Sequence, residues 1–159
     1  MSNDGWVSVD AGAAGSGSGV VLYSVAANPG STARTGTMSI AGFTFTVNQD
    51  PQIPDAPGNL ASASRGSTRV ELSWDDNASN EAWIRIERKL GTAGAFARIL
   101  TVPPDTTGTY DSQVKGATTY LYRVLACNAA GCSAPSNEVT ETTPALGVFI
   151  GEETGEAKR

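Results

Sequence analysis

The sequence predicts an all-β protein in which two small β-sandwich domains follow one another and the first is truncated. The 159 residues are rich in Gly, Ser and Thr but hold only 11 Lys and Arg, a composition that suits strands and turns better than long helices. Short segments of alternating apolar residues recur along the chain, as expected for half-buried strands. Three prolines within residues 51–57 mark a stiff linker between residues 1–50 and residues 58–144.

The composition excludes several function classes. There is no His, so a Ser-His-Asp triad, a Cys-His pair and a His-containing zinc site are ruled out, and we expect neither an enzyme nor a bound cofactor. The net charge of −5 argues against nucleic-acid binding, which needs basic patches. No apolar stretch approaches the roughly 18 residues of a membrane span, and the N-terminal residues do not form a signal peptide.

Residues 1–50 read as four short strands, at 6–9, 20–26, 35–40 and 43–49. Alternation predicts an apolar face that carries Phe43 and Phe45, and we assign Trp6 and Tyr23 to the same small core. Four short strands are marginal as an independent core. We therefore expect this face to be covered by the second domain, by the C-terminal tail or by another chain.

Several motifs of this block resemble the Bacteroidetes-associated carbohydrate-binding domain, known as BACON. They are Trp-Val-Ser-Val at 6–9, Tyr-Ser-Val-Ala-Ala-Asn at 23–28, Arg-Thr-Gly-Thr-Met-Ser-Ile-Ala-Gly at 34–42 and Phe-Thr-Val-Asn-Gln at 45–49. The resemblance implies an immunoglobulin-like sandwich, and it covers only the C-terminal part of such a domain. It also implies a role in binding glycans outside the cell.

Residues 58–144 read as seven short strands at regular spacing, which indicates a second sandwich. Strict alternation at Val70, Leu72 and Trp74 places these three side chains on one face. The predicted core of this block is Trp74, Ile84, Ile86, Tyr110, Tyr120, Tyr122 and Val124.

This second block resembles a bacterial fibronectin type III domain over nearly its whole length. The motifs are Leu-Ser-Trp-Asp-Asp-Asn at 72–77, Asn-Glu at 80–81, Ile-Arg-Ile-Glu-Arg at 84–88, Thr-Thr-Tyr-Leu-Tyr-Arg-Val at 118–124 and Asn-Ala-Ala-Gly at 128–131. The resemblance implies that Trp74 is the core tryptophan and that Tyr120 is the tyrosine-corner residue. It implies little about function, because this fold hosts many unrelated roles.

Cys127 and Cys132 are five residues apart, and the four residues between them are suited to a hairpin turn. Either a disulfide that staples this short loop or two free thiols fits the spacing. A disulfide would stabilise the chain by about 2 kcal/mol and would imply an oxidising compartment.

Three further side chains are candidates for a ligand or an interface. Trp83 and Arg85 alternate with Ile84 and Ile86 and should point away from the core. Trp83 therefore packs against the neighbouring domain or a loop, fills a partner's pocket or stacks on a sugar. Arg34 lies in a predicted turn, where capping backbone carbonyls or pairing with a carboxylate is favoured over ligand binding.

An acidic loop carries Asp75, Asp76, Asn77, Asn80 and Glu81, whose oxygens are of the type that Ca²⁺ binds. The spacing of these residues matches no standard calcium loop. The resemblance explains Asn80 and Glu81 as residues that order the loop, so no metal site is predicted here.

The tail, residues 145–159, contains a compact apolar segment at 146–150 that includes Val148, Phe149 and Ile150. Exposed segments of this kind aggregate. We expect it to add as a strand to an open sheet edge of the first domain or of a neighbouring subunit, rather than to remain a disordered tail.

Together these features predict a non-enzymatic structural or adhesive display module in an extracellular or virion assembly, such as a phage decoration, tail or appendage protein. Its expected partners are other protein subunits and, weakly, cell-surface glycans. The alternative is a carbohydrate-binding or spacer fragment of a secreted bacterial polysaccharide-degrading enzyme or surface protein.

Overall fold

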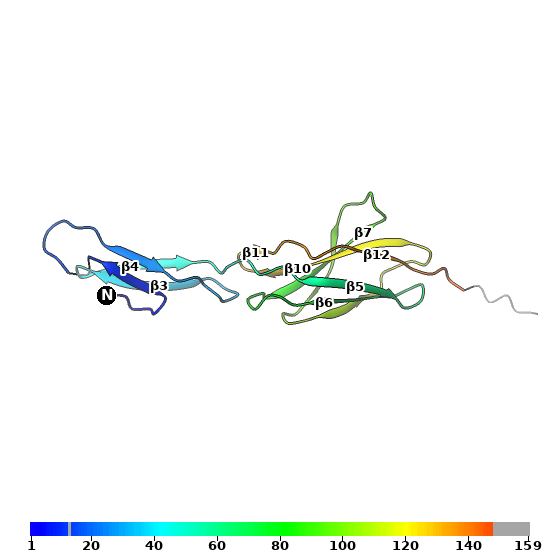
Figure 1. The fold of residues 1–159 in the computed structure, drawn as a ribbon, viewed down its shortest axis with the longest axis horizontal. Helices are drawn as coiled ribbons and strands as arrows, with labels where there is room; N and C mark the ends of the chain where they lie inside the picture. Colours follow the sequence, from blue (N-terminus) through cyan, green and yellow to red (C-terminus); the bar gives the residue numbers. More distant parts are fainter. Residues whose placement is uncertain (13, 148–159) are drawn as a thin grey trace, which may run out of the picture.

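A computed structural model describes residues 1–12 and 14–147, and it shows two β-units placed end to end in an elongated molecule (Figure 1). The described residues form twelve strands and no helix, so the predicted all-β class is confirmed. It follows that no helix capable of crossing a membrane occurs in this part of the chain. Val148, Phe149 and Ile150, the proposed tail strand, lie outside the described residues.

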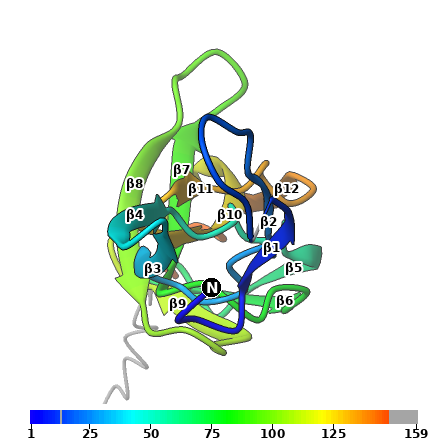
Figure 2. The same ribbon diagram turned by 90° about the vertical axis from the view of Figure 1, so that its left-hand side faces the viewer.

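The first unit consists of two antiparallel pairs that face each other (Figure 2). The strand β1 (Val7–Ala11) pairs with β2 (Leu22–Val25), and β3 (Arg34–Ile40) pairs with β4 (Phe43–Gln49). The N-terminal residues add to the free side of β3, where Ser2 bridges Met38. Among the described residues, β4 therefore keeps one edge without a partner strand.

The closed part of the first unit is small. Val7 and Met38 are each 2% exposed and form its centre. Trp6 precedes β1 and is only half-buried, and its ring lies between the Arg34 guanidinium and Gly36. Gly36 has to be glycine, because a Cβ there would collide with the Trp6 ring.

Within residues 1–12 and 14–147, Tyr23, Phe43 and Phe45 are exposed, contrary to the prediction that they are core residues. Their exposed fractions are 51%, 72% and 48%. Phe45 pairs with the buried Met38 and therefore points to the inner side of the unit. It stays exposed because each layer has too few strands to extend over it, and neither the second unit nor the described part of the tail covers this side.

The second unit is a closed sandwich. One sheet has the order β5 (Gly58–Ser64), β6 (Val70–Asp75), β9 (Gly108–Asp111), and all neighbouring strands are antiparallel. In the other sheet, β10 (Thr119–Asn128) pairs with β7 (Trp83–Leu90), β11 (Gly131–Cys132) and β12 (Val139–Thr142), and β8 (Ala97–Val102) lies beyond β7. The core between the sheets contains Leu60, Val70, Leu72, Trp74, Ile84, Ile86, Val114, Tyr120, Tyr122, Val124 and Ala126.

Two tyrosines of β10 form hydrogen bonds to residues 111–115, at the end of β9 and in the segment that follows it. The Tyr120 hydroxyl accepts a hydrogen bond of 2.9 Å from the Lys115 backbone N–H, the geometry of a tyrosine corner. The buried Tyr122 hydroxyl donates to Asp111, which also pairs with Arg88 at 2.6 Å. Burial and the Asp111 carboxylate raise the pKa of Tyr122 far above its ordinary value, so it stays protonated and holds Asp111 inside.

The junction between the units is held by asparagine side chains. The linker carbonyl of Gln52 accepts hydrogen bonds from the amides of Asn80 and Asn128, and the Ala56 carbonyl accepts one from Asn77. On the other side of the junction, the Gln52 N–H donates to the Asn28 carbonyl. The loops of the second unit therefore fix the path of the linker.

Candidate binding surfaces

A shallow hollow lies on the outer face of the three-stranded sheet of the second unit. Its volume is about 470 Å³. The aromatic ring of Tyr110 and the charged side chains of Arg65, Arg69 and Glu71 line it, together with small and polar residues of β5, β6 and β9. We call this surface the Tyr110 hollow.

The prediction that Tyr110 belongs to the core is wrong, because its side chain is 50% exposed. The register explains why: Tyr110 stands opposite Glu71, whereas its neighbour Asp111 stands opposite the fully buried Val70. Residues opposite each other in an antiparallel pair share a face, so Tyr110 must point outward. The buried partners of Asp111 hold this register in place.

The charged residues of the Tyr110 hollow, two arginines and one glutamate, form a connected set of ion pairs. Glu71 pairs with Arg65 at 2.8 Å and with Arg69 at 3.2 Å, and Arg69 also lies 4.1 Å from the centre of the Tyr110 ring. The hydrogen bond from Arg65 lowers the pKa of the Glu71 carboxyl and raises that of the guanidinium. The Arg69 guanidinium lies over one face of the Tyr110 ring. The charged groups around the ring can form hydrogen bonds with a neutral polar ligand.

Trp83 and Arg85 lie on the outer face of β7 and are half-buried. Arg85 pairs with Glu87 at 3.4 Å, and Glu87 pairs in turn with Arg123 at 2.7 Å. The charge of Arg85 is thus engaged within the chain. Trp83 is less exposed than Tyr110, and its role in binding stays a prediction.

Arg34 begins β3, and its guanidinium is used inside the first unit. It donates to the carbonyls of Ala26 and Ala27 at 2.7 and 2.8 Å and to the Gln49 side chain at 2.9 Å. The same group covers the Trp6 ring at 4.1 Å. These contacts match the carbonyl-capping interpretation of Arg34, and its proposed role at an interface stays a prediction.

Cys127 and Cys132 are joined by a disulfide across the pair β10–β11. Cys127 also stands opposite Trp83 in the register of β10 and β7. The disulfide therefore lies beside Trp83 and staples the short hairpin that faces the first unit. In that hairpin the Ala129 N–H donates to the Ser31 carbonyl across the junction.

The inner side of the first unit presents an apolar surface made of Tyr23, Phe43 and Phe45. It borders the free edge of β4, whose sequence Phe-Thr-Phe-Thr-Val-Asn-Gln carries no charge. An edge strand that lacks charge, proline and a cover is open to pairing with another strand. This surface and the Tyr110 hollow are the two best candidates for contact with other molecules.

The Tyr110 hollow is missing from the expectations drawn from the sequence, although one signal for it was present. The alternation of Val70, Leu72 and Trp74 toward the core requires Arg69 and Glu71 to face outward. Only the pairing of β6 with β9 adds Tyr110 to them, and pairing partners cannot be read from a four-residue strand that carries one aromatic residue.

Comparison with known proteins gives one match to a family model. Residues 1–50 match the BACON family, which is described as "Putative binding domain, N-terminal". The matched range coincides with β1–β4 and the N-terminal residues that pair with β3. The match supports the resemblance drawn from the sequence for this part of the chain.

The chain is also similar to proteins that contain related modules. Chitinase A1 of Niallia circulans is 34% identical over 117 residues, which cover 69% of this chain but only 16% of the chitinase. The chicken CNTN1 FN1-FN3 domains superpose with a TM-score of 0.54 at 18% identity, covering 58% of this chain and 33% of theirs. The FN5 domain of Drosophila Lar gives 0.50 at 20% identity, covering 59% and 100%. These structures show an immunoglobulin-like, fibronectin type III-like fold over the part of the chain that they cover.

Proposed function

We propose that this chain is a non-enzymatic adhesive module, displayed outside the cell, that binds polysaccharide weakly through the Tyr110 hollow. The observation that carries the proposal is a half-exposed tyrosine ring on an open sheet face with charged hydrogen-bonding groups around it. Sugar rings stack on such aromatic faces, and their hydroxyls need hydrogen-bond partners at the rim. The similarity to a chitinase and to a BACON domain supports a polysaccharide as the ligand class.

The shape of the molecule suits such a role. Two units joined end to end by a hydrogen-bonded linker form an extended spacer (Figure 1). The disulfide fits display in an oxidising environment. A spacer of this kind holds its binding surface away from the body that carries it.

The test is retention on insoluble chitin, with cellulose as a second polysaccharide. The full chain should be retarded on at least one of them, and Tyr110→Ala should lower the retained fraction several-fold, since it removes the aromatic ring on which the sugar would stack. Leu90→Ala, which removes an exposed side chain of the same unit outside the hollow, is the control and should retain binding. Equal retention of wild type and Tyr110→Ala would contradict the proposal.

A second candidate is a structural role in a larger assembly, such as a virion, in which copies of this chain pair through β4. The exposed Phe43 and Phe45 and the free, uncharged edge of β4 favour it. Two identical neutral strands can pair in antiparallel fashion without like-charge repulsion. Such a pair would extend the β3–β4 layer over the aromatic side chains.

The oligomeric state tests this candidate. The chain should self-associate in light scattering coupled to gel filtration, and Thr46→Lys, in the middle of β4, should make it monomeric. Ser39→Lys places the same charge on β3, which already has partners on both sides, and should not alter assembly. A wild-type chain that stays monomeric at high concentration would exclude pairing through β4.

A further inference from the structure

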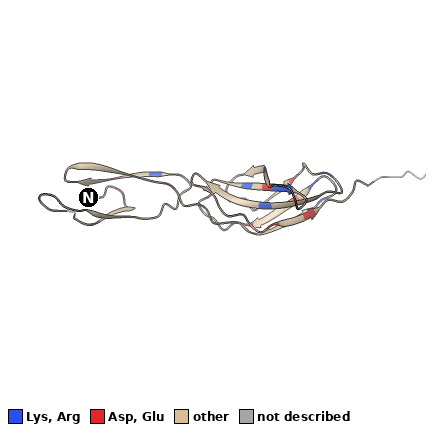
Figure 3. Ribbon diagram, turned by 90° about the horizontal axis from the view of Figure 1, so that it is seen from above, with Lys and Arg blue, Asp and Glu red and all other residues tan. Residues whose placement is uncertain are grey.

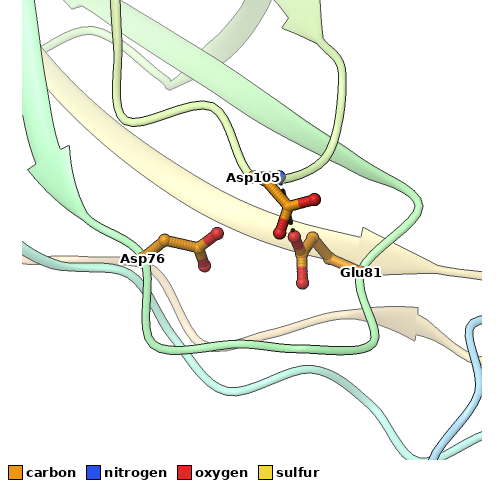
Figure 4. Close-up of side chains that lie close together, drawn as sticks. All are labelled: Asp76, Glu81 and Asp105. Carbon is orange, nitrogen blue, oxygen red and sulfur yellow. Dashed lines mark hydrogen bonds between the residues drawn. The ribbon is translucent and has the colours of Figure 1, made fainter.

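Three carboxylates meet at the end of the second unit that faces the linker (Figure 4). Asp76 and Glu81 come from the loop between β6 and β7, and Asp105 comes from the loop between β8 and β9. One oxygen from each lies within 4.8 Å of the others. Among the described residues, none of the three carboxylates forms an ion pair with Lys or Arg.

The decisive feature is Glu81. Its side chain is buried, with only 6% of the residue exposed, and it points toward the other two carboxylates. One carboxylate oxygen accepts a 3.0 Å hydrogen bond from the Asp105 N–H, whereas the other, Oε2, is buried without any donor. A buried carboxylate oxygen without a donor is costly, and two further carboxylates beside it raise that cost. A bound cation would remove both penalties.

We propose that Asp76, Glu81 and Asp105 form a binding site for Ca²⁺. Carboxylate oxygens are the ligands that this ion prefers. One oxygen from each carboxylate lies within 4.8 Å of the others, so a single ion can contact all three. Ca²⁺ accepts irregular sets of oxygen ligands, whereas Mg²⁺ demands near-ideal octahedral geometry and loses its water reluctantly, so ligands from two separate loops suit Ca²⁺ better. Asp76 and Asp105 reach the solvent side, so water completes the coordination.

The bound ion would hold the β6–β7 loop to the β8–β9 loop. Because the β6–β7 loop contacts the linker, the ion would also stabilise the junction between the units. Asn77, next to Asp76, donates to the linker carbonyl of Ala56, and Asn80, next to Glu81, donates to that of Gln52. Holding Asp76 and Glu81 to Asp105 thus also holds both linker contacts. Calcium would stiffen the path between the units, independently of whether the Tyr110 hollow binds polysaccharide.

The experiment is a titration of the full chain after treatment with a chelator. Calorimetric titration should show one Ca²⁺ site with a Kd of about 0.1–1 mM, the range of extracellular calcium modules, and weaker binding of Mg²⁺. Calcium should raise Tm above the value in Mg²⁺ at equal ionic strength. Equal Tm values in the two ions, with no heat of calcium binding, would overturn the proposal.

Asp105→Asn is the informative variant because its side chain is exposed and Asn tolerates the positive φ of 57° found there. It should raise Tm in chelator, since one repelling charge is gone, and weaken calcium binding at least about tenfold. Asp75→Asn removes the same charge from a neighbouring residue, which instead bonds Asn59, and should leave calcium binding intact. An equal loss of calcium affinity in both variants would indicate a general charge effect rather than a site. Unchanged calcium binding in Asp105→Asn would also refute the proposed site.

Discussion

The two units follow one sandwich plan, but the second is closed and the first is open. In the second unit, two sheets enclose eleven buried hydrophobic residues, and charged residues recur along its strands (Figure 3). In the first unit, two pairs of strands leave large apolar side chains exposed, and Arg34 is the sole basic residue of residues 1–50. The contrast shows that alternation specifies which side of a strand is apolar, whereas the number of strands decides whether that side is covered.

The largest expected effect comes from shortening one apolar side chain in each unit. Ile86→Ala removes a fully buried side chain and should lower the free energy of unfolding of the second unit by about 2–5 kcal/mol. Phe43→Ala removes a larger side chain that is 72% exposed, and the change should stay within about 0.5 kcal/mol. Urea denaturation of both variants measures the difference.

Ile53→Ala is the chemical control for this pair, because it makes the same change at a linker position that is 56% exposed. It should behave like Phe43→Ala. A loss above about 2 kcal/mol in Phe43→Ala would mean that the side chain is covered in solution. That result would favour self-association through the first unit and would remove the contrast between the units.

Much of the fold was predictable because it depends on local alternation. Short patterns and turn residues predict the strands at 43–49 and 83–90 and the inward side chains of Trp74 and Ile84. They also predict the hairpin that holds Cys127 and Cys132. The exposure of Phe43 was not predictable, because it depends on strands that would have to come from elsewhere. The pairing of residues 1–3 with β3 is likewise a long-range contact without a local signal.

The candidate sites were less predictable than the fold for the same reason. Asp76 and Glu81 are recognisable in the sequence as an acidic loop, but Asp105 lies 24 residues beyond Glu81 and joins them only through the packing of two loops. Tyr110 reaches the outer face only because Asp111 is held inside by Arg88 and Tyr122. Both sites depend on buried contacts between segments that are distant in sequence.

The smallest expected effect is the pH dependence that the carboxylate cluster gives to the second unit. Burial, and then the charges of Glu81 and Asp105, raise the pKa of Asp76 above its ordinary value of 3.8. The folded chain then holds a proton that the unfolded chain has already released. In chelator, the contribution of Asp76 to the free energy of unfolding should therefore fall as the pH rises from 3.8 through the raised pKa, and should become level above it.

Asp76→Asn should abolish this fall, because the amide does not titrate. Urea denaturation between about pH 4 and pH 7 measures it. Asp10→Asn, which removes an exposed carboxylate from the first unit, controls for net charge and should keep the wild-type fall. Calcium should suppress the fall in wild type, because bound cation replaces the proton that the cluster otherwise retains. If wild type and Asp76→Asn showed the same pH dependence, repulsion among the three carboxylates would not contribute to it. The carboxylate cluster would then not distinguish the second unit from the first.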